Sequence, residues 1–123
     1  MIPNPYQQYQ QNMVKTASPA QLVLMLYNGA LRFIKQAQIS LAAKQLEECH
    51  QNIIKAQRIV TELMLNLDLS QGVIAQNLYQ LYDYMYQRLV EANLQKTEAP
   101  LQEVEQLLQE LKNTWSEAIK LMP

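Results

Sequence analysis

The chain has 123 residues, of which 49% are hydrophobic and 17% are charged, and its formal net charge is -1. This length suits one domain that buries its own core. The near-neutral charge excludes the strongly basic surface of a nucleic-acid-binding domain. With 2 glycines and 5 prolines, the chain also has too few turn residues for an all-β fold.

The N-terminus shows no signal for secretion or for membrane insertion. It has no basic region followed by an apolar core. The longest apolar run, residues 22–27, is far shorter than the roughly 20 residues that span a bilayer. We therefore expect a cytoplasmic protein with no membrane insertion.

Residues 1–17 differ in composition from the rest of the chain. They are polar, rich in glutamine and asparagine, and interrupted by prolines, so we expect a flexible N-terminal segment followed by a helical domain over residues 18–123. Tyr6 and Tyr9 are unusual in a plain tail, because large aromatic rings favour contact with apolar surface. They suggest that the segment docks onto a surface.

The first helix is expected to begin at Ser18. Ser18 is a suitable N-cap, Pro19 suits the first helical position, and Gln21 completes a capping-box pattern. The spacing of apolar residues predicts an inward stripe of Val23, Leu26, Ala30, Phe33 and Ala37. This stripe does not continue in phase into the next one, so we place a turn near residues 40–45.

Three further helices are predicted from apolar stripes that alternate three- and four-residue steps. The second stripe is Leu46, Cys49, Ile53, Ala56, Val60, Leu63 and Leu67, and it stops before the turn residues 68–72. The third stripe is Ile74, Leu78, Leu81, Met85, Leu89 and Ala92, with a break at residues 95–100. The fourth is Leu101, Val104, Leu108, Leu111, Trp115, Ala118 and Met122. Four such helices with short connections predict an all-α antiparallel four-helix bundle.

One pattern in the second helix is typical of catalytic bundles. Glu47 and His50 form a Glu-x-x-His pair, of which di-iron bundles use two. The chain has one histidine, so a second pair would require another copy of the chain. Cys49 fits the inward stripe, and its glutamate neighbours disfavour a reactive thiolate. With no phosphate-binding loop and no catalytic triad either, we expect no metal, no cofactor and no enzymatic activity.

Apolar residues also lie outside the four inward stripes. The candidates for a partner-binding surface are Ile54 and Leu65 on the second helix, Tyr79, Tyr82 and Tyr86 on the third, and Leu107 on the fourth. One interpretation is a wide core-facing stripe, which is common in globular helices. The other is an exposed groove between helices that receives an amphipathic partner helix.

Several stretches, taken together and in this order, resemble the flagellar export chaperones of the FliS family. They are NPYQQY, TASPAQLVLMLYNGALRFIKQA, IIKAQRIVTELMLNLD, IAQNLYQLYDYM, RLVEAN and LLQELKNTW, and they cover nearly the whole chain. The resemblance implies a helical bundle without catalytic activity that works in the bacterial cytoplasm.

The resemblance also implies partners and sites. Members of this family bind the C-terminal region of flagellin, prevent its premature polymerisation and deliver it to the flagellar type III export gate. The six candidate residues are then expected to include cargo contacts, and Tyr6 and Tyr9 match positions that cap the cargo groove in the free protein. A homodimer that exchanges N-terminal segments stays open, and so does a generic helical adaptor that binds another amphipathic helix.

Overall fold

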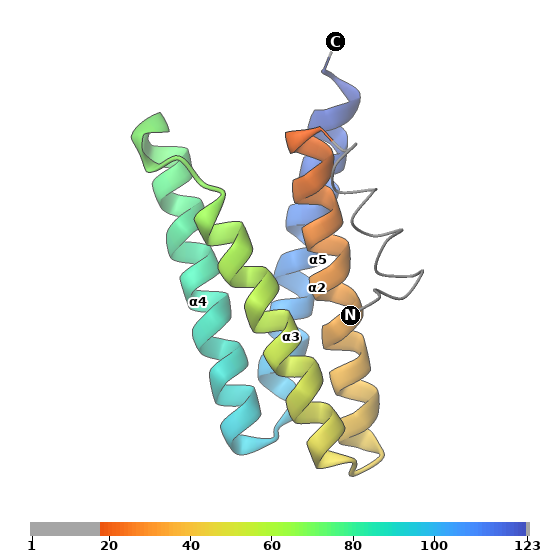
Figure 1. The fold of residues 1–123 in the computed structure, drawn as a ribbon. Helices are drawn as coiled ribbons and strands as arrows, with labels where there is room; N and C mark the ends of the chain where they lie inside the picture. The colour runs from red at the N-terminus through yellow and green to blue at the C-terminus, as the bar shows by residue number, and fades with distance from the viewer. Residues whose placement is uncertain (1–17, 123) are drawn as a thin grey trace, which may run out of the picture.

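The structure, a computed structural model, describes residues 18–122. Within these residues it contains four long helices and one short 3-10 turn. The helices are α2 (Pro19–Ala42), α3 (Leu46–Leu65), α4 (Val73–Gln95) and α5 (Glu98–Lys120), and the turn η1 (Leu69–Gln71) precedes α4. The predicted all-α, antiparallel four-helix arrangement is confirmed (Figure 1).

The predicted start of the first helix is also confirmed. The Ser18 Oγ accepts a hydrogen bond from the Gln21 N–H at 3.2 Å, and the Gln21 Oε1 accepts one from the Ser18 N–H at 3.1 Å. This capping box satisfies two donors that the first turn of a helix leaves unpaired. The turn predicted near residues 40–45 lies between Ala42 and Leu46.

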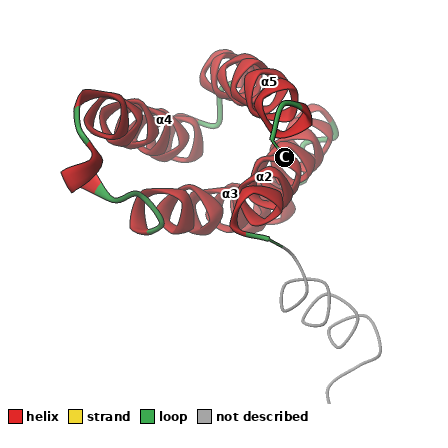
Figure 2. Cartoon of the chain, turned by 90° about the horizontal axis from the view of Figure 1, so that it is seen from above, coloured by secondary structure: helices red, strands yellow, loops and turns green. Residues whose placement is uncertain are grey.

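The helices form a ring in which each one packs against two neighbours. The neighbours along the chain pack together, and α5 closes the ring by packing against α2 (Figure 2). Trp115 strengthens this closure, because its Nε1–H donates a hydrogen bond to the Ala20 carbonyl at 2.8 Å. The centre of the ring is filled by buried residues of all four helices, including Ala30, Ile53, Leu89 and Val104.

The bundle is tight at one end and spread at the other. At the closed end, short turns join α2 to α3 and α4 to α5, whereas at the open end α4 and α5 lie far apart (Figures 1 and 2). Burial follows this shape. Met85 and Leu108 are fully buried, but Ile74 is 78% exposed and Met122 is 55% exposed at the open end.

Several predicted stripe positions are therefore wrong at their outer ends. Ile74, Ala118 and Met122 were predicted to face inward and are exposed, because the helices diverge before these residues can meet a neighbour. Leu46, the first residue of α3, is half-exposed for a related reason, since it lies at the end of the bundle.

The inward face of α2 is also centred differently from its prediction. Tyr27 and Ile34 are buried although they lie outside the predicted stripe, and Val23, Leu26 and Phe33 are only partly buried. The reason is that α2 packs against both α3 and α5, so two flanks of the helix are covered.

Candidate partner-binding surface

A hydrogen bond between side chains near the closed end shows which flanks of α3 and α4 face each other. The Lys96 Nζ donates to the Asn93 Oδ1 at 2.6 Å. The same amide group lies against the His50 ring, with its Nδ2 at 2.9 Å and its Oδ1 at 3.1 Å from His50 Nδ1. His50 and Asn93 thus mark one shared border between the two helices.

Four of the predicted partner-binding residues lie along this border. On α3, Ile54 follows His50 by about one turn, and Leu65 lies farther along the same flank. On α4, Tyr86 and Tyr79 precede Asn93 by about two and about four turns. Leu65 and Tyr79 are exposed, and Ile54 and Tyr86 are half-buried. We call these four residues the α3–α4 seam.

The seam leads to a cluster of exposed apolar residues at the open end. Leu65 is 74% exposed, and Leu69, Val73 and Ile74 are also exposed within the next nine positions of the chain. We call these four residues the open-end rim. Exposed apolar groups gathered in one place are typical of surfaces that bind a partner.

The rim was largely missed by the sequence analysis, which placed Ile74 inward and did not single out Leu69 or Val73. A signal was available, because apolar residues stand on both sides of Gly72, in a connection where polar residues are usual. Gly72 itself has a φ of 105°, in the region that favours glycine.

Tyr82, another of the candidate residues, lies in the core of the bundle. It is 2% exposed, and its hydroxyl lies 2.6 Å from the hydroxyl of Tyr27. Burial raises the pKa of both tyrosines above the ordinary value. The even spacing of Tyr79, Tyr82 and Tyr86 suggested one stripe, but Tyr82 precedes the buried Met85 by three residues and so shares its inward face.

Leu107 lies on a different flank from the seam. It is half-buried against the core of the bundle, one turn after Glu103. Glu103 accepts hydrogen bonds from the Tyr84 hydroxyl at 2.8 Å and from Arg88 Nε at 2.7 Å, so this flank of α5 faces α4. The two donors lower the pKa of Glu103. Leu107 is therefore separated from the α3–α4 seam by α4.

The residues considered for metal or thiol chemistry have structural contacts. The Glu47 carboxylate accepts a hydrogen bond from Gln51, and His50 bonds to Asn93. Cys49 is buried, and this burial raises the pKa of its thiol. In the part of the chain that the structure describes, no group of three or more His, Cys, Asp or Glu residues is placed to hold a metal ion.

Two further predictions concern the N-terminal segment and the membrane. Tyr6 and Tyr9, the predicted groove cap, lie outside the described residues. Among residues 18–122, no helix combines the length and the apolar character needed to cross a membrane.

In comparisons with known proteins, nearly the whole chain matches one family. The family described as flagellar protein FliS matches residues 2–122. A flagellar secretion chaperone FliS of Bacillus subtilis (strain 168) is 42% identical over 120 residues, which cover 97% of this chain and 89% of the relative. A protein of the same description from Campylobacter jejuni is 33% identical over 113 residues, which cover 91% of this chain and 88% of the relative.

Proposed function

The chain belongs to the FliS family of flagellar secretion chaperones, and from this we propose that it binds the C-terminal region of flagellin. The bound chaperone prevents premature polymerisation and delivers its cargo to the flagellar type III export gate, and it does so in the cytoplasm. The family is one of chaperones and not of enzymes.

The observation that carries the proposal is the set of apolar residues in the α3–α4 seam and the open-end rim, most of which are exposed. A partner helix can place apolar side chains along such a surface at intervals of three and four residues. Contact with exposed residues such as Leu65 and Ile74 removes apolar area from water. That gain in free energy offsets the cost of ordering a disordered segment on binding, which is roughly 2–5 kcal/mol.

Residues 1–17 are proposed to compete with cargo for the same surface. They join the chain at Ser18, directly before α2, which begins at the open end (Figure 1). Tyr6 and Tyr9 are the side chains suited to cover apolar groups of the rim in the free protein. Exchange of this segment between two copies would produce a homodimer, and export-gate components are the partners that receive the loaded complex.

The first test is a calorimetric titration with a peptide from the C-terminal region of the flagellin of the same organism. We expect one-to-one binding, a negative heat-capacity change and a gain of helix measured by circular dichroism. Absence of binding at about 100 μM, which corresponds to a binding free energy of about 5–6 kcal/mol, would contradict the flagellin assignment and favour the generic adaptor.

A matched pair of variants tests the location of the site. Ile74 and Leu94 lie on the same helix with 78% and 81% exposure, but Leu94 lies near the closed end and outside the seam. We expect Ile74→Ala to weaken binding of the peptide and Leu94→Ala to leave it unchanged. Equal effects of the two variants would move the cargo site away from the rim.

A deletion tests the proposed cap. Removal of residues 1–17 is expected to tighten cargo binding and to increase the fluorescence of a hydrophobic dye, because apolar surface becomes free. The double variant Tyr6→Ala/Tyr9→Ala should reproduce part of both effects. If neither quantity changes in the deletion variant, the segment does not cover the cargo surface.

A further inference from the structure

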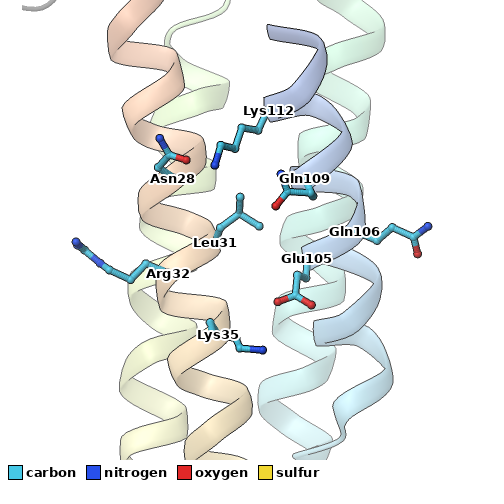
Figure 3. A pocket seen from close by; sticks show the side chains of 8 residues that line it. All are labelled: Asn28, Leu31, Arg32, Lys35, Glu105, Gln106, Gln109 and Lys112. Atoms are coloured by element: carbon cyan, nitrogen blue, oxygen red, sulfur yellow. The ribbon is translucent and has the colours of Figure 1, made fainter. Parts of the chain in front are cut away.

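A groove lined mostly by residues with polar or charged side chains runs between α2 and α5, away from the surface proposed to bind cargo. It has a volume of about 580 Å³ and is lined by residues of both helices (Figure 3). In the ring of helices, the α2–α5 border lies opposite the α3–α4 border. A ligand in this groove would therefore leave the α3–α4 seam free.

The groove has the length of a short helix contact. On α2 its lining extends from Asn28 to Lys35, and on α5 it extends from Glu105 to Lys112. Each interval is about two helical turns, or roughly 10 Å along the axis. Two neighbouring helices with a shallow groove between them can receive a third helix at the usual axis separation of about 8–10 Å.

The charges in the groove are arranged around an apolar centre. Lys35 extends into the groove from α2 near one end, Lys112 extends into it from α5 near the other, and Leu31 lies between them (Figure 3). Arg32 also lines the groove, and its guanidinium lies 5.1 Å from the centre of the Phe33 ring. The neutral amide of Gln109 faces Leu31 and offers hydrogen bonds without a charge.

Basic side chains outnumber acidic ones in the lining of the groove. Among the described residues, neither Lys35 nor Lys112 has an ion-pair partner. The acidic residue of the groove, Glu105, accepts a hydrogen bond from Gln38 at 3.5 Å. The helix α2 contains no Asp or Glu at all, so its outer face is locally positive on a chain with a net charge of -1.

We propose that the α2–α5 groove docks a short acidic helix of a partner protein. Such a helix would carry two carboxylates about two turns apart, one for Lys35 and one for Lys112, with an apolar side chain between them to contact Leu31. Charge complementarity selects this occupant. Residues 1–17 of the chain contain Lys15 and no Asp or Glu, so they do not complement the two lysines.

A nucleic acid fits the groove less well than an acidic helix. A polyanion that continued along α5 past Lys112 would approach Glu117, whereas a short helix ends before it. The apolar centre at Leu31 also has no role with a phosphate backbone. The docking site does not depend on the identity of the cargo, because it lies on the opposite side of the bundle.

The test uses the full chain and a synthetic, alanine-based helical peptide with two glutamates seven positions apart and a leucine between them. Fluorescence anisotropy measures the affinity. We expect one-to-one binding that weakens as salt screens the charges, and loss of about tenfold in affinity for Lys35→Glu/Lys112→Glu.

Two controls separate docking from general attraction between charges. The double variant Lys55→Glu/Arg58→Glu changes the net charge by the same amount on α3, which does not line the groove, and it should bind the peptide with wild-type affinity. A peptide with glutamine in place of both glutamates should bind at least about tenfold more weakly. Circular dichroism of each variant checks that the helices are intact.

A local readout completes the test. Because Cys49 is buried, Gln109→Cys provides an accessible thiol for a fluorophore inside the groove, and its emission should change when the peptide binds. Failure of the wild-type chain to bind the acidic peptide overturns the proposal. Equal loss of affinity in the two double variants, or unchanged emission of the label at saturation, also overturns it.

Discussion

At the scale of single residues, the pair Tyr27 and Tyr82 is the polar contact inside the ring that connects α2 with α4. The two helices are not ring neighbours, and the hydroxyls meet at 2.6 Å in a buried position. Each hydroxyl is the partner of the other, so the loss of one leaves the other buried without a hydrogen bond. An unpaired buried polar group costs about 1–3 kcal/mol.

This pairing predicts strong non-additivity. Tyr27→Phe and Tyr82→Phe should each lower the free energy of unfolding by about 1–3 kcal/mol. The double variant should lose no more than either single one, because no unpaired hydroxyl remains. Urea unfolding followed by circular dichroism measures all four proteins, and additive losses would show that the hydroxyls do not act as a pair.

The same pair predicts a loss of stability at alkaline pH. Burial raises the pKa of Tyr27 and Tyr82 in the folded protein, whereas the tyrosines of the unfolded chain titrate near about 10. Above that pH the unfolded chain releases protons that the folded chain retains, so the free energy of unfolding falls as pH rises. Unfolding measured between neutral and alkaline pH should give a smaller decline for the double phenylalanine variant than for the wild type.

At the scale of the helices, the N-cap residues of α2 and α5 offer a direct comparison. Ser18 caps α2 through a side-chain hydrogen bond, whereas Thr97 at the start of α5 makes none. Ser18→Ala should therefore lower the free energy of unfolding by about 1 kcal/mol, and Thr97→Ala should have little effect. Thermal unfolding of both variants checks this, and equal effects would show that the capping box does not stabilise α2.

The helices were predictable from sequence to different degrees, and the reasons are physical. The start of α2 and the inward face of α3 were correct because Ser18, Pro19 and Gln21 act locally and because Cys49 to Leu63 alternate clearly with polar residues. The predicted inward face of α2 was wrong because that helix is apolar on most sides, and the periodicity of apolar residues does not distinguish between its flanks. The position of Ile74 was wrong because periodicity cannot show that a neighbouring helix has moved away.

At the scale of the whole molecule, the arrangement of the candidate partner-binding residues was only partly predictable. The sequence places Ile54, Leu65, Tyr79 and Tyr86 on their own helices, but which flanks of the two helices meet is set by tertiary packing, and the contact between His50 and Asn93 marks it in the folded chain. Tyr82 differs from its neighbours because only tertiary packing separates an inward tyrosine from an outward one. The groove at Lys35 and Lys112 has no sequence pattern, since each lysine comes from a different helix.

The difference between the two ends of the bundle predicts a gradient of local stability along α4. Residues 77–81 lie nearer the open end and are themselves half-buried or exposed. Residues 85–92, in contrast, include the fully buried Met85 and Leu89. Local opening costs less where fewer apolar contacts must be broken. Hydrogen exchange measured by mass spectrometry should therefore be faster in residues 77–81, and uniform exchange along α4 would contradict this.

The hydrogen bond from Trp115 to Ala20 makes the chain suitable for label-free spectroscopy. Trp115 is the single tryptophan, so ultraviolet emission excited at the indole band comes from one known position. That position is the last part of α5 beside the first turn of α2, where residues 1–17 join the described structure. A change in emission wavelength would report directly on events at this junction, and stopped-flow mixing would give their rates without any dye or engineered probe.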